Sequence, residues 1–319
     1  MNSIHQKSLS IKNLFFYFCK PFVPRGMQIF ARRYVIRRKK SRYAGIWPIN
    51  EQAGAAPAGW TGWPDKKRFA LVLQHDVDTQ KGHDNCRRLM DLEEKLGVRS
   101  TFYVVPERYR VSPELLQEIK QRGFGLGVHG LKHDGKLFFS YKTFTEQAKK
   151  INGYLRSWEV TGFSSPSMIR RHEWMHNFDI EYSTSTFDTD PFEPQPEPAN
   201  TIFPFFVCND PNKKCFLEMP YTLPQDFTLF VLMGEKTIDI WKNKLDWIAK
   251  HGGMALVNSH PDYMNFKTGT CGREEYPFRY YEDFILHVQE NYKDLYWHAL
   301  SEKVAAFIKS GQTERTGKK

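Results

Sequence analysis

The chain has 319 residues, of which 40% are hydrophobic and 15% aromatic, enough to build a substantial core in one large domain or two small ones. Its formal net charge of +10 comes from residues 1–43, which hold eleven of the 46 basic residues and no acidic one. The remaining 35 basic residues face 36 acidic ones, so the body is near neutral and nucleic acid is excluded as an expected partner.

The basic arm, residues 1–43, does not read as a signal peptide. Its apolar block at residues 14–19 is too short and is followed by Lys20 and Pro21. No stretch approaches the roughly 20 apolar residues of a membrane-spanning helix. We therefore expect a cytoplasmic protein, or one held peripherally at the inner membrane face.

Within the arm, residues 26–40 place Met27, Phe30 and Tyr34 at helical spacing among arginines and lysines. A basic amphipathic helix of this kind could lie on an anionic membrane surface. It could equally dock on the protein's own surface or stay disordered. A liposome-binding assay with and without the arm would separate these hypotheses.

The next segment, residues 44–67, is rich in Gly, Ala, Pro and Trp without periodicity and is interpreted as a linker or a wrapped segment. An alternation of apolar runs and helical patterns follows from residue 68. Strands are expected at 69–74, 101–105, 125–128, 161–164, 180–184, 215–219 and 254–258. Helices are expected at 82–96, 113–122, 141–158, 236–251 and 299–309.

Repeated strand–helix units predict an α/β fold with a parallel sheet and right-handed crossovers, closed or nearly closed into a barrel. Residues 186–235 interrupt the alternation of strands and helices and are interpreted as an insertion of hairpins and loops. These patterns define a domain at 68–308, followed by a polar tail at 309–319.

The five cysteines are scattered and show no zinc-binding spacing, which favours a reducing compartment. Cys208 and Cys215 flank a turn-like segment and could pair, although unpaired thiols are the preferred interpretation.

The stretch that organises the chain is the apolar run at 69–74, which ends abruptly in His75, Asp76 and Asp78. In α/β folds, functional groups gather where parallel strands end in loops. If the strand ends at Asp76, the following turn can bring both acids near one point. One acid could then hold a metal while the other handles a proton.

Two further strand ends carry histidines. His129 and His133 follow a short glycine-rich strand, and the glycines suggest a tight turn that enters a helical turn. Two histidines and one carboxylate can make a catalytic zinc or iron(II) site. His260 ends the apolar run 254–258 and is held by Pro261, and a lone histidine can act as a general acid at neutral pH.

This order of motifs, an acid pair, then His-x-x-x-His, then a strand ending in His-Pro, resembles the polysaccharide deacetylase superfamily, named for the nodulation chitooligosaccharide deacetylases. The resemblance covers roughly residues 68–300, and the split acid pair looks like the branch whose first motif reads His-Asp-Val-Asp.

The resemblance implies a deformed (β/α) barrel with a divalent metal, commonly zinc, at its C-terminal face. By position, Asp76 corresponds to the catalytic base, Asp78, His129 and His133 to metal ligands, and His260 to the general acid. The implied reaction is hydrolysis of an N-acetyl group from an acetylated saccharide. Such chemistry suits a metal that polarises the carbonyl and lowers the pKa of water.

One departure concerns the arginine that usually orients the catalytic base, because Ser164 stands at that position here. Arg170 or Arg171 could reach in from the following helix, or His75 could substitute. If none does, Asp76 loses its orienting partner and activity falls.

The fourth family motif is hard to place, and Asp188 and Asp190 are the candidates for lining the cleft; a capped turn explains them equally well. The aromatic residues around them could stack on sugars, but core packing is the default interpretation.

Two alternatives stay open. A nucleotide-sugar glycosyltransferase could use Asp76 and Asp78 as its metal–diphosphate motif, but this would leave His129, His133 and His260 without a role. A catalytically weakened, glycan-binding relative would explain the missing arginine.

Overall fold

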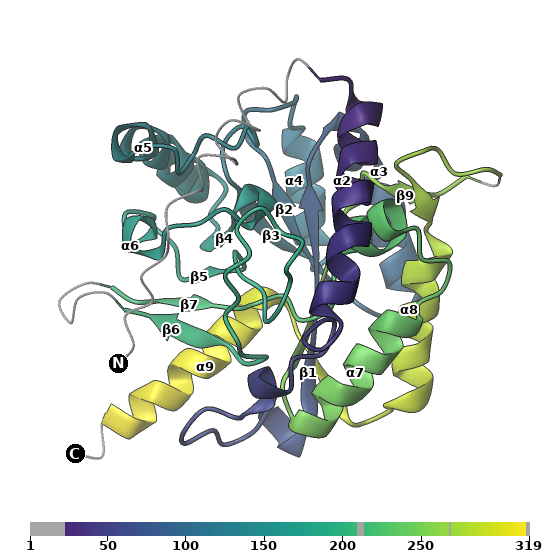
Figure 1. The fold of residues 1–319 in the computed structure, drawn as a ribbon. Coiled ribbons are helices and arrows are strands. Elements are labelled where there is room, and N and C mark those ends of the chain that lie inside the picture. The colour runs from purple at the N-terminus through teal and green to yellow at the C-terminus, as the bar shows by residue number, and fades with distance from the viewer. Residues whose placement is uncertain (1–22, 209–213, 268, 317–319) are drawn as a thin grey trace.

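The computed structural model describes residues 23–208, 214–267 and 269–316 (Figure 1). Its strands are β1 (Phe69–Val77), β2 (Thr101–Val104), β3 (Gly125–His129), β4 (Gly162–Ser164), β5 (Tyr182–Ser183), β6 (Phe205–Val207), β7 (Phe216–Glu218), β8 (Met254–Ser259), β9 (Met264–Asn265), β10 (Tyr276–Pro277) and β11 (Tyr296–His298). Its helices are α2 (Arg25–Lys40), α3 (Gln80–Lys95), α4 (Pro113–Gln121), α5 (Tyr141–Ser157), α6 (His172–Met175), α7 (Asp239–His251), α8 (Arg279–Asn291), α9 (Ser301–Thr316), the π-helix η6 (Phe227–Met233), and the short turns η2 (Ser41–Tyr43), η3 (Glu51–Gly54), η4 (Pro64–Lys66) and η5 (Pro166–Met168).

The main sheet has the strand order β11-β1-β2-β3-β4-β5-β7-β6, with β8 on the other edge of β1. Its ladders between described residues are parallel except that of β6 with β7. The segment after β7 pairs with β8 through a parallel bridge between Leu223 and Val257. Because β8 also pairs with β1, this bridge joins distant parts of the strand order and the sheet is curved. The expected deformed (β/α) barrel is therefore confirmed.

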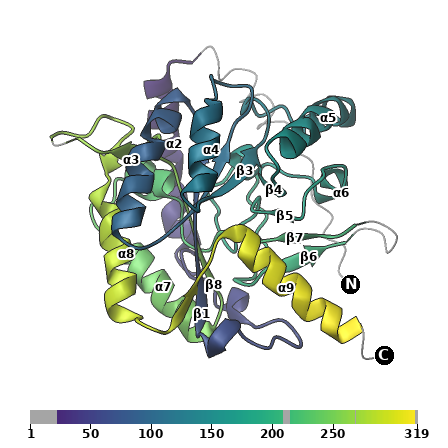
Figure 2. The ribbon, with the colours of Figure 1, turned by 180° about the vertical axis from the view of Figure 1, so that it is seen from behind.

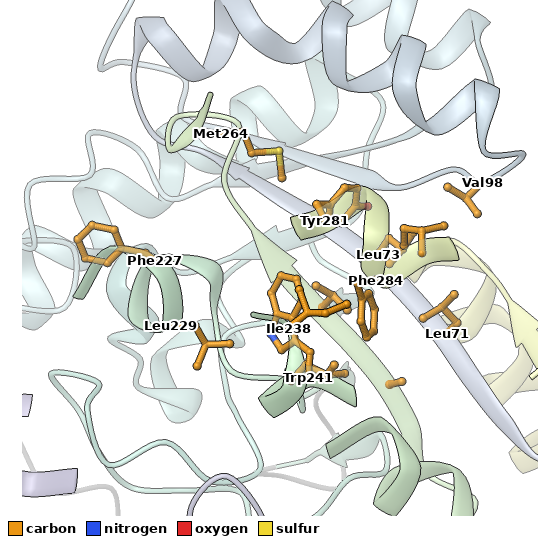
Figure 3. Packing of buried hydrophobic residues seen from close by; sticks show 14 of the residues in the cluster. Leu71, Leu73, Val98, Phe227, Leu229, Ile238, Trp241, Met264, Tyr281 and Phe284 are labelled. Carbon is orange, nitrogen blue, oxygen red and sulfur yellow. The ribbon is translucent and has the colours of Figure 1, made fainter. Parts of the chain in front are cut away.

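β1 is buried along its whole length, as its unbroken apolar run predicts. Leu71 and Leu73 belong to the cluster that packs under helices α7 and α8, where Phe284 lies beside them and Trp241 packs on Phe284 (Figure 3). The alternate residues of the strand, Ala70 and Val72, belong to a second cluster with residues of neighbouring strands. Helices lie around the outside of the curved sheet in both views (Figures 1 and 2).

The segment 186–235 contains the expected hairpin, β6–β7, but also the π-helix η6, which the sequence analysis did not predict. Cys208 and Cys215 form a disulfide across this hairpin, so the preference for unpaired thiols was wrong. The pairing also removes the argument for a reducing compartment, because disulfides persist in oxidising environments.

Helix α2 bears out the helix expected at 26–40. It lies along the outside of the molecule and packs against η6, whereas residues 1–22 of the arm lie outside the described part (Figure 1). Helix α9 continues to Thr316, past the expected start of the polar tail. None of the described helices is both long enough and apolar enough to cross a bilayer.

Candidate metal centre and active site

The two acids of the first motif lie on one face at the C-terminal end of β1. The strand continues to Val77, beyond the expected range of 69–74, so the extended backbone itself brings the two acids together and the turn considered at Asp76 is not needed. Side chains two residues apart in a strand point to the same face, and this period aligns Asp76 with Asp78. Their exposed fractions are only 2% and 7%, so both carboxylates are removed from bulk water.

Asp78 meets the two histidines of the second motif. Its Oδ1 lies 3.3 Å from His129 Nε2 and 3.0 Å from His133 Nε2. One ligand atom from each of the three residues falls within 4.8 Å of the other two. The predicted convergence of positions 78, 129 and 133 is thus present in the fold.

These donors fit a divalent cation. Two imidazole nitrogens and one carboxylate oxygen are the ligand set of many catalytic zinc and iron(II) sites. Burial alone would raise the pKa of Asp78, but the charge of His133 and hydrogen bonds from both imidazoles hold that pKa well below its usual range. Burial lowers the pKa of His133, which favours the neutral ring that a metal binds.

The chain between β3 and α5 turns sharply to bring His133 back to Asp78. It does so through bends and not through the expected helical turn. Gly130 has a φ of +59°, and a Cβ there would lie 2.6 Å from the ring of Pro166. His133 itself has a φ of +53°, in the left-handed region that a side chain rarely adopts. Backbone strain of this kind is concentrated at functional sites.

A carbonyl from the neighbouring strand orients His129. The β3–β4 ladder sets Ser164 opposite His129, and His129 Nδ1–H donates to Ser164 O at 3.1 Å. This bond leaves Nε2 as the nitrogen that faces Asp78, the arrangement by which metal-binding histidines are held in one tautomer.

Asp76 is held from the opposite edge of β1. Asn258 Nδ2 on β8 donates to Asp76 Oδ2 at 2.9 Å. The other oxygen, Oδ1, is buried, lies 3.5 Å from His129 Nδ1 and has no hydrogen-bond partner among the described residues. Asn258 was missed in the sequence, although its place two residues before His260, on the same strand face, could have indicated it.

His260 is paired with an acid that the sequence analysis did not single out. Its Nδ1 lies 2.7 Å from Asp226 Oδ1, and its backbone N–H donates to Asp226 Oδ2 at 2.8 Å. Tyr276 and the backbone of Phe227 donate to the same carboxylate. Burial would lower the pKa of His260, but the charge and hydrogen bond of Asp226 raise it to about 10, with a smaller contribution from Asp78.

The other proposed partners of Asp76 make no contact with it among the described residues. His75 lies on the opposite face of β1, where its Nε2 meets Glu93 Oε1 at 2.9 Å. Buried Arg170 donates to the carbonyls of Met168 and Glu197. The guanidinium of Arg171 lies 4.6 Å from the ring centre of Trp174. We conclude that Asn258 takes the place expected for these three residues.

Asp188 and Asp190 are both buried but engaged elsewhere. Asp188 is paired with Lys244, and Asp190 accepts a hydrogen bond from Tyr221 at 2.9 Å. Burial raises the pKa of each carboxyl to about 6. These contacts favour a structural role for both carboxylates.

The aromatic residues of this segment also follow the default expectation of core packing. Phe187 and Phe203 are fully buried, and Phe192, Phe205 and Phe206 pack partly buried against the core clusters.

Comparison with known families supplies an independent observation. Residues 65–171, which include Asp76, Asp78, His129 and His133, match the family model described as polysaccharide deacetylase. This region, about a third of the chain, is similar to the polysaccharide deacetylase family. Deacetylases are hydrolases that act on carbon–nitrogen bonds other than peptide bonds, so the expected enzyme class is confirmed.

Solved structures show that the fold of most of the chain occurs in other proteins. A Mycobacterium smegmatis protein assigned to the polysaccharide deacetylases is 17% identical with a TM-score of 0.62, covering 81% of this chain and 96% of its own. An allantoinase, Puue, is 15% identical with a TM-score of 0.56, covering 78% and 93%. A Pseudomonas aeruginosa PAO1 protein assigned to the deacetylases is 17% identical with a TM-score of 0.53, covering 76% and 92%. No curated protein matches the chain.

Proposed function

We propose that this protein is a metal-dependent hydrolase that removes N-acetyl groups from a saccharide containing amino sugars. The observation that carries the proposal is the meeting of Asp78, His129 and His133 beside a second buried carboxylate, Asp76. His260 follows β8, which lies along one edge of β1, whereas β3, which carries His129, lies beyond β2 on the other edge.

The three proposed ligands would hold a divalent cation, and zinc is the metal we expect. When bound, such a cation supplies Lewis acidity, which polarises the acetyl carbonyl and lowers the pKa of water. The chain's own contribution is to hold the ligands rigidly. His129 is fixed by Ser164 O, and His133 by the strained loop that begins at Gly130.

Asp76 is placed to act as the general base. Its buried Oδ1 would take a proton from the attacking water, while Asn258 holds Oδ2 and so fixes the direction of the carboxylate. Water adds its oxygen to the carbonyl carbon, the carbon–nitrogen bond breaks, and the products are acetate and a free amine.

His260 is placed to act as the general acid. The bond of Nδ1 to Asp226 leaves Nε2 as the nitrogen that would donate a proton to the departing amine. Because the pKa of His260 is raised to about 10, the ring carries that proton throughout the neutral range. Asp226 plays the part of an orienting acid.

The decisive experiment measures acetate release from acetylated oligosaccharides together with metal content. We expect Asp76→Asn to abolish acetate release while the bound metal is retained, and His129→Ala to lose both. Absence of release from a broad panel of glycans by metal-loaded wild-type protein would contradict the proposal and favour the inert, glycan-binding relative.

The contacts of Asp78 weigh against the glycosyltransferase alternative. Both histidines of the second motif contact Asp78, so they belong to the same site as the acid pair. Metal-dependent hydrolysis of a nucleotide sugar without acetate release would be the result that restores this alternative.

A further inference from the structure

Helix α2 carries apolar side chains on two opposite faces, and only one face is used by the fold. On the inner face Ile29 and Ile36 are buried, and Arg33 donates to Val231 O at 3.0 Å from Nε and 2.8 Å from Nη2. The helix is therefore docked on η6 without help from its opposite side.

The outer face of α2 consists of residues at helical spacing: Met27, Phe30, Ala31, Tyr34, Val35 and Arg38. Its large apolar members are exposed by 63% at Met27, 73% at Phe30, 51% at Tyr34 and 48% at Val35. An apolar stripe of this length on a helix that is already docked indicates a second surface to which it binds.

The charge around this face identifies the surface. Arg37 and Arg38 are exposed and form no ion pair with a described residue, and the Arg38 guanidinium lies 4.8 Å from the ring centre of Tyr34. No acidic residue occurs anywhere in residues 1–43. A second copy that packed its own α2 on this face would therefore meet like charge with like charge, whereas an anionic lipid surface complements it.

The inner face of α2 connects this surface to the catalytic end of the barrel. The Arg32 guanidinium lies 5.0 Å from the ring centre of Phe227, whose ring lies 4.5 Å from that of Tyr263. The ring centre of Tyr263 in turn lies 5.2 Å from that of His260, with the two rings tilted by 51°. A membrane under α2 would thus lie a few side chains away from the proposed general acid.

We propose that the outer face of α2 lies on an anionic bilayer surface and holds the active site against saccharides carried on that surface. The choice of substrate rests on the proposed deacetylase function, whereas the lipid-binding face does not.

Sedimentation of the full chain with vesicles tests the binding face. Wild-type protein is expected to bind vesicles that mix phosphatidylglycerol with phosphatidylcholine, and to bind phosphatidylcholine alone weakly. The pairs Phe30→Ser with Tyr34→Ser, and Arg37→Glu with Arg38→Glu, should each lower partition onto anionic vesicles about tenfold or more.

Matched controls carry the same changes on other exposed positions: Leu286→Ser with Leu295→Ser, and Lys142→Glu with Lys149→Glu. These should bind as wild type does. Failure of the wild type to bind anionic vesicles, or unchanged binding by both outer-face pairs, overturns the proposal. So does a dimer in solution that Phe30→Ser with Tyr34→Ser dissociates, because the stripe would then serve a second copy.

Measurements of acetate release test the surface-held substrate separately from the lipid-binding face. An acetylated chitooligosaccharide is offered free in solution and, in parallel, attached to a lipid tail in anionic vesicles. The outer-face variants should lose activity only on the anchored form, and an equal loss on both forms overturns the surface-held substrate. If the wild type acts on neither, the proposed function fails while sedimentation still decides the membrane face.

Discussion

Asn258 donates a 2.9 Å hydrogen bond to Asp76 across the β1–β8 ladder, so the carboxylate is oriented from the strand that also delivers His260. The partner expected from the family pattern was an arginine in the segment that here contains Ser164. In this chain Ser164 orients His129 through its carbonyl, and the side chain that orients Asp76 comes from elsewhere in the barrel.

The first prediction concerns Asn258. Replacing it with Ala frees the Asp76 carboxylate to rotate, and we expect kcat to fall by about tenfold to a hundredfold with metal content unchanged. Replacing it with Asp sets two carboxylates together, which raises the pKa of one and moves the acid limb of the pH–rate profile to higher pH. Unchanged pH dependence in Asn258→Asp would contradict the assigned role.

The second prediction concerns Asp226. His260 must be protonated to act as an acid, so activity falls as the pH rises through its pKa, which Asp226 raises to about 10. In Asp226→Asn the stabilising charge is lost while burial still lowers the pKa of His260. We therefore expect the alkaline limb of kcat to move to lower pH. An alkaline limb that stays in place would show that His260 is not the acid.

The third prediction concerns metal removal. A ligand that binds only the folded state at a thousandfold excess over Kd stabilises it by about 4 kcal/mol. Chelation should therefore lower the thermal midpoint of the wild type, and zinc should restore it. Asp78→Asn and His133→Asn should melt at the same temperature with and without chelator. Equal sensitivity to chelation in these variants would place the metal elsewhere.

The fourth prediction tests whether His75 contributes to the stability of the fold or to catalysis. Its ring and Tyr281 both contact Glu93 in the core, and Ser259 binds the other ring nitrogen. We expect His75→Ala to lower the free energy of unfolding by about 1–3 kcal/mol, because buried polar partners lose their hydrogen bonds. The kcat of the folded protein should change less than threefold. A large loss of kcat without a loss of stability would restore the orienting role proposed from the sequence.

The fifth prediction concerns the hairpin disulfide. Alkylation of the unreduced, unfolded protein should block two fewer thiols than alkylation after reduction, and peptide mapping should assign them to Cys208 and Cys215. Closing so short a loop is worth about 2 kcal/mol, so Cys208→Ser with Cys215→Ser should lower stability by that amount. Its kcat should match that of the wild type. Full labelling before reduction would contradict the pairing.

Elements with a strong local signal were predicted well. Ser112 and Pro113 indicated the start of α4. In the structure the Ser112 side chain accepts a hydrogen bond from the Leu115 N–H, as expected of an N-cap residue. The apolar run at 69–74 was also predicted correctly, because an unbroken apolar run of this length indicates a buried strand, and it lies within the fully buried β1. By contrast, η6 was missed because an apolar run of aromatic and branched residues does not by itself distinguish a strand from a buried helical turn. The pair α8–β11 was also missed, although the buried residues of α8 recur at helical spacing.

The sequence by itself determined the alternation of strands and helices, the acid pair at the end of β1 and the histidines at two other strand ends, because each depends on residues close together in the chain. Only the tertiary structure decided which partners orient them. Asn258 reaches Asp76 and Asp226 reaches His260 through ladders and helix packing that join distant segments, and no local pattern encodes such a pairing. The same holds for the exposed stripe of α2, since a helix with apolar residues on two faces reveals its free face only once the other is buried.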